Sequence, residues 1–135
     1  MSATAPPPHI VVVDDDELLA ELMQTHLADL GYTVTSCTRG DEAFGVVRPA
    51  RPDLVILDVR MAGLGGLGVL YLLATDPQTA RIPVLLCTAV SAAEMQAWDE
   101  VLDQKGVPIL FKPFALADLM AAVRALLPTS NTEAA

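Results

Sequence analysis

The chain alternates short runs of strand-favouring residues with longer segments of helical period five times, and this alternation limits the possible fold more than any other feature of the sequence. The strand-favouring runs are residues 9–13, 32–37, 53–58, 84–86 and 107–111. The run from Leu54 to Leu57 is apolar at every position, which is typical of a strand covered on both faces. Strands that alternate with helices favour a parallel sheet with right-handed crossovers. The sequence therefore predicts an α/β fold in which a five-stranded parallel sheet carries helices on both faces.

The segments between these strand-favouring runs have the features of amphipathic helices. In the first of them, the apolar residues that share one face of a 3.6-residue period are Leu19, Leu22, Met23, Leu27 and Leu30. Gly31 is expected to stop this helix. A second helix over 41–47 is expected to be closed by Pro49 and Pro52, because proline cannot donate to the helical ladder. Three further helices are expected over 67–75, 92–104 and 116–127. A flexible loop before the third helix is expected from four glycines, Gly63, Gly65, Gly66 and Gly68.

Length and apolar content indicate one folded domain. The chain has 135 residues, of which 53% are apolar, and this is enough for a single buried core. Residues 9–128 are expected to form the domain, with a disordered tail over 1–8 and a flexible tail over 129–135. The N-terminal tail lacks the features of a secretory signal, and no apolar run approaches the roughly 20 residues of a membrane span. Cys37 and Cys87 are expected to be buried free thiols, which fits a reducing, cytoplasmic location.

The charge of the chain argues against two classes of partner. Eight Lys and Arg residues against 17 Asp and Glu residues give a formal charge of −9, and the chain has no basic stretch. Phosphate backbones and anionic membrane surfaces are bound by clustered basic residues. We therefore expect neither nucleic acid nor membrane among the direct partners.

Polar side chains end four of the predicted strands. The first strand is followed by Asp14, Asp15 and Asp16, the third by Asp58, and the fifth by Lys112, while Thr88 closes the fourth. In a doubly wound sheet, the carboxyl ends of the strands form the ligand-binding edge. Two carboxylates about 4 Å apart repel each other by roughly 4 kcal/mol at an effective dielectric near 20, so a cation is needed. Magnesium suits a site of a few carboxylates with water and phosphate better than calcium does.

These residues fit phosphoryl transfer to a carboxylate. Asp58 ends the central strand ahead of the glycine-rich loop and fits a nucleophile that forms an aspartyl phosphate. Asp14 and Asp15 fit the metal pair, and Lys112 would neutralise charge on the phosphoryl oxygens. Taken singly, each residue has a simpler explanation: a helix cap, a turn or a core hydroxyl. Their joint placement favours the functional interpretation.

Four stretches in order, VVVDDDELL, PDLVILDVRMAGLGG, PVLLCTA and FKPF, resemble the receiver domain of bacterial two-component response regulators. From Asp15 to Asp58, Thr88 and Lys112 the successive gaps are 43, 30 and 24 residues. The resemblance covers about residues 9–127. It implies a flavodoxin-like sheet in the order 2-1-3-4-5 with five flanking helices.

The resemblance also implies a role for each site residue. Asp58 would take a phosphoryl group from a sensor histidine kinase or a phosphotransfer protein. Mg²⁺ would be held by Asp14, Asp15, Asp58 and the backbone carbonyl of Arg60, whereas Asp16 would not be a ligand. Two further residues, Thr88 and Lys112, would hold phosphoryl oxygens, and the bond before Pro113 would be cis, an isomer that proline permits at low cost.

The sequence departs from the family pattern at several positions. The loop after the phosphoacceptor usually carries a proline and an aspartate, and these places fall on Ala62 and Gly65. Glycine is a weaker N-terminal helix cap than aspartate, so the start of the next helix is expected to change. The aromatic switch position, three residues before the lysine, falls on Ile109. Phosphorylation is then expected to survive even where its usual readout does not.

Only seven residues follow Pro128, too few for a DNA-binding module. We therefore expect a stand-alone receiver, a monomer or weak dimer, that signals to a downstream protein through its fourth helix, fifth strand and fifth helix. The expected activity is a switch that catalyses only its own phosphorylation and dephosphorylation, not an enzyme acting on other substrates. One alternative is a constitutive interaction module that works without phosphorylation. Others are a flavodoxin-type binder and a phosphatase, although Arg60 stands where a dedicated phosphatase would want its second acid.

Overall fold

The computed structural model describes residues 6–61, 65–89, 93, 96 and 106–127. Its elements in chain order are β1 (His9–Val13), α1 (Glu17–Asp29), β2 (Thr33–Cys37), α2 (Gly40–Ala50), β3 (Leu54–Leu57), α3 (Gly66–Thr75), β4 (Val84–Thr88), β5 (Ile109–Phe111) and α6 (Leu116–Leu126). The five strands are parallel and lie in the order β2-β1-β3-β4-β5. This confirms the predicted α/β fold and strand order. Of the helix expected over 92–104 only residues 93 and 96 are described, so this expectation is not tested. Ala62, Gly63 and most of the two expected tails lie outside the described residues.

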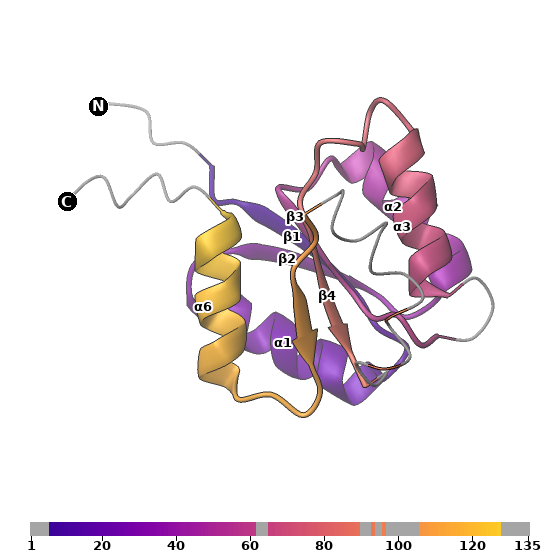
Figure 1. Cartoon of the computed structure of the whole chain (residues 1–135). Coiled ribbons are helices and arrows are strands. Elements are labelled where there is room, and N and C mark those ends of the chain that lie inside the picture. The colour runs from indigo at the N-terminus through magenta and orange to yellow at the C-terminus, as the bar shows by residue number, and fades with distance from the viewer. Residues whose placement is uncertain (1–5, 62–64, 90–92, 94–95, 97–105, 128–135) are drawn as a thin grey trace.

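The sheet separates two apolar cores. Figure 1 shows α1 and α6 on one side of the sheet and α2 and α3 on the other. In β1, Ile10 and Val12 face α1 and α6, whereas Val11 and Val13 face α2 and α3. All four residues of β3 are buried, because helices cover both of its faces. The unbroken apolar runs of the sequence therefore predicted these inner strands correctly.

Helix α1 begins and ends at residues whose chemistry explains both boundaries. The Asp16 side chain accepts a hydrogen bond from the Leu19 N–H at 3.1 Å and so caps the helix. At the other end, Gly31 has φ +99°, a left-handed conformation that glycine adopts without strain. The expected stop at Gly31 is confirmed.

The expectation for the second helix was wrong at its end. Helix α2 includes Pro49 and runs on to Ala50. The proline lies in the last turn, where only one hydrogen bond is lost, and the Arg51 N–H still bonds to the Val47 carbonyl at 2.9 Å. Arg51 itself leaves the helix with φ 48° and ψ 58°, in the left-handed region.

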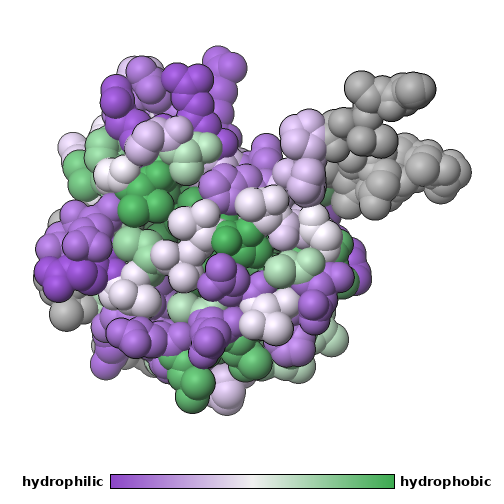
Figure 2. All heavy atoms as spheres, turned by 180° about the vertical axis from the view of Figure 1, so that it is seen from behind, coloured by the Kyte–Doolittle hydropathy of each residue, from purple (hydrophilic) through white to green (hydrophobic). Residues whose placement is uncertain are grey.

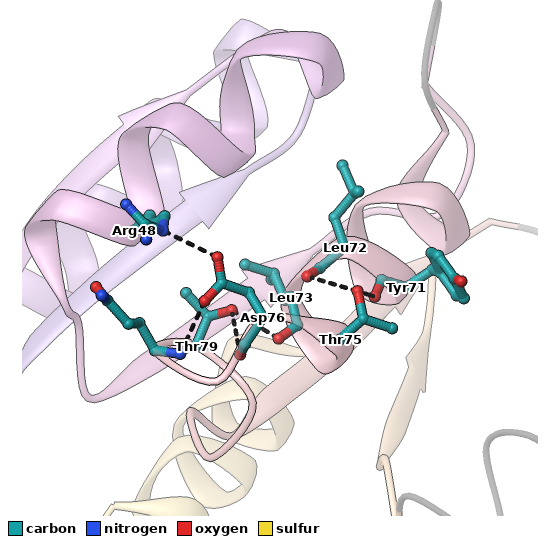
Figure 3. Close-up of polar contacts among 8 residues, drawn as sticks. Arg48, Tyr71, Leu72, Leu73, Thr75, Asp76 and Thr79 are labelled. Carbon is teal, nitrogen blue, oxygen red and sulfur yellow. Dashed lines mark hydrogen bonds and ion pairs between the residues drawn. The ribbon is translucent and has the colours of Figure 1, made fainter.

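Polar contacts fix the end of α3 to α2 (Figure 3). The Arg48 guanidinium of α2 donates to the Asp76 carboxylate at 2.9 Å, just beyond the last residue of α3. The same carboxylate accepts the Gln78 N–H at 2.8 Å, and the buried Thr79 hydroxyl donates to the Leu73 carbonyl at 2.6 Å. These bonds hold the connection between α3 and β4, so that α3 is anchored at the end far from Asp58.

Both cysteines are free and buried, as expected. Burial is the main reason that the pKa of the Cys87 thiol is raised to about 12. A thiol of this kind stays protonated and unreactive at neutral pH. The cysteines therefore act as small apolar core residues.

The surface mixes polar and apolar residues. On the face in Figure 2, apolar residues form separate areas among polar ones. The described large apolar side chains that stay exposed are Leu18, Leu22, Leu30, Tyr71 and Phe111. Within the described part of the chain, none of the helices combines the length and the apolar character that crossing a membrane requires.

Two glycine substitutions are predicted to have opposite effects on stability. Gly45 lies inside α2, and a Cβ atom there would meet nothing within 4 Å. Gly45→Ala should raise the free energy of unfolding by about 0.5–1 kcal/mol, because alanine has the higher helix propensity. Gly31→Ala also meets no neighbour but must adopt φ +99°, so it should lower stability by about 1 kcal/mol. Urea unfolding of both variants checks the pair; equal effects would contradict it.

Candidate functional site

The register of the sheet brings the polar strand ends together at one edge. Val13 and Leu57 are register partners, so Asp14 and Asp58 follow neighbouring strands at the same level. The Asp58 N–H donates to the Val13 carbonyl at 2.9 Å, which ties the phosphoacceptor candidate to β1. On the other side, the Lys112 N–H donates to the Thr88 carbonyl at 2.8 Å and extends the pairing of β4 and β5 by one residue. The backbone of the sheet therefore positions all of these residues.

Three carboxylates converge at this edge. One oxygen from each of Asp14, Asp15 and Asp58 lies within 4.8 Å of the other two. Asp14 is only 1% exposed and Asp58 only 4% exposed, whereas Asp15 is exposed to solvent. Buried like charges at this separation repel one another strongly, because little water screens them. The cluster therefore needs positive charge.

Lys112 supplies part of that charge. Its Nζ lies 2.8 Å from Asp14 Oδ2 and 3.4 Å from Asp58 Oδ2. Burial lowers the pKa of the ammonium group, but the hydrogen bond to Asp14 and the charges of Asp14 and Asp58 outweigh this, so the pKa is raised overall. Lys112 is thus firmly charged and offsets one of the carboxylates.

The pKa of Asp58 is raised, first because the group is buried and second because the Asp14 charge repels its ionised form. Lys112 and the Arg60 N–H, which donates to Asp58 Oδ1 at 3.3 Å, lower the pKa but do not cancel the increase. The folded protein therefore disfavours the ionised form of Asp58. A second cation beside the carboxylates would stabilise that form.

The residues at this edge fit Mg²⁺. All three donors are carboxylates, the hard oxygen ligands that Mg²⁺ prefers, and the exposed Asp15 leaves the cluster open to water molecules that would complete an octahedral shell. The Arg60 N–H donates a hydrogen bond to the Asp58 carboxylate. The Arg60 carbonyl, which is the predicted backbone ligand, therefore belongs to the same turn as Asp58. That ligand remains a prediction.

The other site candidates lie in or next to β4, β5 and α3. Thr88 is fully buried at the end of β4 and is the register partner of Phe111. Ile109 is half-buried as the first residue of β5 and packs against the core beneath α2 and α3. The Lys112–Pro113 peptide bond is cis. Gly65 is the N-cap of α3 and has no side chain with which to cap it.

Sequence reasoning missed one local interaction. The Asp16 N–H donates to Asp14 Oδ1 at 2.9 Å, so Asp16 both caps α1 and orients the buried carboxylate two residues before it. An aspartate that accepts a bond from the backbone two residues on is a common turn signal, and the Asp-Asp-Asp run contained it.

Comparison with known proteins gives the class to which this fold and site belong. The family model of the response regulator receiver domain matches residues 10–124. The chain therefore belongs to the response regulator receiver domain family.

Relatives of the chain include longer regulators. It is 34% identical over 126 residues to the phosphate regulon transcriptional regulatory protein PhoB of Rhizobium meliloti, covering 93% of this chain and 55% of that protein. It is also 34% identical to the DNA-binding dual master transcriptional regulator RpaA of Synechocystis sp., covering 89% of this chain and 49% of that protein. The chain thus spans about half the length of the curated relatives it matches.

Solved structures of single receivers match along their full length. The chemotaxis protein CheY4 of Vibrio cholerae has a TM-score of 0.79 and 25% identity, with 90% of this chain and 99% of that chain covered. The BeF3-activated N-terminal receiver domain of RstA from Klebsiella pneumoniae has a TM-score of 0.77 and 26% identity over the same shares of the two chains.

Proposed function

We propose that this receiver accepts a phosphoryl group on Asp58 from the phosphohistidine of a sensor histidine kinase or a phosphotransfer protein. One observation carries the proposal: carboxylate oxygens of Asp14, Asp15 and Asp58 lie within 4.8 Å of one another, and the Lys112 ammonium touches two of the three. The phosphorylated form acts through protein contacts or a phosphorelay in the cytoplasm. The domain is a switch that catalyses only its own phosphoryl transfer and dephosphorylation.

The chemistry follows from the groups around Asp58. A carboxylate oxygen of Asp58 attacks phosphorus, an O–P bond forms, and the P–N bond of the donor breaks with its electron pair returning to the imidazole nitrogen. Lys112, 3.4 Å from Asp58 Oδ2, is close enough to turn its ammonium to a phosphoryl oxygen, and the Thr88 hydroxyl would bind another. When bound, Mg²⁺ supplies positive charge for the remaining oxygen and for the carboxylates.

Two surfaces suit the partners of such a switch. Helix α1 begins three residues after Asp14 and exposes Leu18 and Leu22, which are 76% and 48% exposed and lie one turn apart. This apolar strip beside the site suits a helix of the phosphodonor protein. Downstream proteins would bind the face formed by β5, where Phe111 is 41% exposed, together with α6 and the helix expected over 92–104. Apolar side chains exposed in this way are frequent anchors of protein contacts.

A second candidate function is a constitutive interaction module that keeps the fold without using phosphorylation. Ile109 favours it, because this side chain occupies the position from which the family's aromatic ring normally reports the phosphorylated state. Gly65 favours it as well, since α3 begins without a capping side chain.

A phosphodonor assay separates the two functions. The purified chain is mixed with acetyl phosphate and Mg²⁺ and resolved on a gel that retards phosphorylated proteins. We expect a retarded band that is lost in Asp58→Asn and retained in the matched control Asp41→Asn, since Asp41 is an exposed acid paired with Arg39. An unshifted wild type would support the constitutive module instead. A band that persists in Asp58→Asn would assign the phosphoryl group to another residue.

A further inference from the structure

We propose that Gly66 is a positioning residue for the phosphoacceptor, because its lack of a side chain lets the first turn of α3 rest directly on the peptide that joins Asp58 to Val59. The inference depends on the proposed function and deepens it. It assigns to one of the four glycines a definite role in place of general loop flexibility.

The space at Gly66 is already filled by the backbone of the phosphoacceptor. A Cβ atom built on Gly66 would overlap the Asp58 carbonyl oxygen and would lie 2.6 Å from the Val59 Cα and 2.8 Å from the Asp58 carbonyl carbon. Carbon atoms in ordinary contact are about 3.5–4.0 Å apart. All three neighbours are backbone atoms, which cannot rotate away as a flexible side chain can. Any other residue at this position must therefore move either α3 or the Asp58–Val59 segment.

Glycine is required at position 66 because there is no space for a Cβ atom, and not because the backbone has a positive φ angle. Among the described glycines, positive φ angles occur at Gly31 and Gly106, and Gly66 is an ordinary helical residue. Its N–H donates to the Val59 carbonyl at 2.9 Å, so the helix start is also hydrogen-bonded to the segment on which it rests. The glycine thus brings α3 and the phosphoacceptor strand into direct backbone contact.

Movement of α3 is the more difficult of the two adjustments. Its residues Val69, Leu70 and Leu73 are buried in the core, and its far end is tied to α2 through Arg48 and Asp76 (Figure 3). Well-packed cores resist displacement. The strain from a larger residue at position 66 is therefore expected to fall on the Asp58–Val59 segment, just beyond the end of β3.

Displacement of this segment would change the geometry of the site. The Asp58 carboxylate lies in the cluster with Asp14 and Asp15 and within 3.4 Å of the Lys112 ammonium, and the Arg60 N–H reaches back to it at 3.3 Å. A misplacement of about 1 Å in an otherwise intact site lowers rates by up to roughly 100-fold. Substitution of Gly66 is thus expected to impair Mg²⁺ binding and phosphorylation beyond any effect on stability.

The test compares Gly66→Ala with Gly65→Ala, the same substitution one residue earlier. A Cβ atom on Gly65 would approach only the Val59 carbonyl oxygen, at 3.3 Å, which a small shift relieves. Both substitutions are introduced into a Gly45→Ala parent, because Gly45→Ala is expected to stabilise α2 away from the site. Three quantities are measured: the free energy of urea unfolding, the Mg²⁺ affinity by calorimetry, and the rate of phosphorylation by acetyl phosphate.

We expect Gly66→Ala to fold cooperatively, to bind Mg²⁺ at least about 10-fold more weakly and to be phosphorylated at least about 10-fold more slowly, while Gly65→Ala stays close to its parent. Three outcomes would overturn the inference in favour of a structural role. They are an unchanged Mg²⁺ affinity and phosphorylation rate in Gly66→Ala, equal losses in both variants, and a Gly66→Ala chain that does not fold. If the parent binds Mg²⁺ but is not phosphorylated, the proposed function fails while the affinity comparison still decides the role of Gly66. A parent that neither binds Mg²⁺ nor becomes phosphorylated overturns both the proposed function and the role of Gly66.

Discussion

Lys112→Met is expected to lower the free energy of unfolding by about 3 kcal/mol in Mg²⁺-free buffer at neutral pH, since removing one partner of a buried ion pair leaves the other charge uncompensated. The Lys112 ammonium lies 2.8 Å from Asp14 and 3.4 Å from Asp58, and both carboxylates are almost fully buried. Methionine keeps most of the side-chain volume, so the loss reports the charge. Urea unfolding with and without EDTA measures it.

The same substitution should lower the rate of phosphorylation by acetyl phosphate roughly 100-fold or more, because a fixed positive charge is lost where negative charge develops on the phosphoryl group. Saturating Mg²⁺ should restore part of the stability but little of the rate. Arg124→Met, which removes an exposed cation from the last turn of α6, is the control and should change neither quantity appreciably. A Lys112→Met protein as stable as wild type in EDTA would contradict this account of the site.

Asp58→Asn is expected to act in the opposite direction on stability. In Mg²⁺-free buffer at pH 7 the variant should be about 1–2 kcal/mol more stable than wild type, because it removes a buried carboxylate that burial and Asp14 both disfavour. Since the pKa of Asp58 is raised in the folded protein, the cost of ionising it is present above that pKa and disappears below the ordinary aspartate value. The advantage of the asparagine variant should therefore shrink as the pH falls through the folded pKa of Asp58.

Mg²⁺ should reverse this difference. Added to saturation, it stabilises the wild type, which retains all three carboxylates, more than it stabilises Asp58→Asn. Unfolding curves at several pH values with and without Mg²⁺ give the result. A variant that is less stable than wild type in EDTA at pH 7 would show that Asp58 stabilises the metal-free fold and that the repulsion argued here is too small to matter.

Much of the fold was predictable from the hydrophobic pattern, whereas the order of the strands followed from the family resemblance. The runs at 10–13 and 54–57 have no polar position, which predicted strands inside a sheet covered on both faces, and the alternation with helices predicted that this sheet is parallel. The end of α2 was not predictable in this way, because a proline in the last turn costs one hydrogen bond and the core contacts of Val47 outweigh it.

The site followed from the same rule, since parallel strands place their carboxyl ends at one edge. The sequence therefore indicated that Asp14, Asp58 and Lys112 would meet. It did not indicate that Asp15 is exposed while its neighbour is buried, or that the Asp16 N–H orients Asp14, because these depend on the turn into α1. The backbone contact at Gly66 was hidden for a similar reason: it involves two segments whose approach only the assembled core determines.

The most direct test of the central claim is a calorimetric titration of the chain with Mg²⁺ at low ionic strength, repeated for Asp14→Asn, Asp15→Asn and Asp58→Asn. The account predicts one site per wild-type chain and a marked loss of affinity in each variant, because the three carboxylates act on the same ion. An absence of Mg²⁺ binding by wild type, or binding that none of the three substitutions weakens, would contradict it.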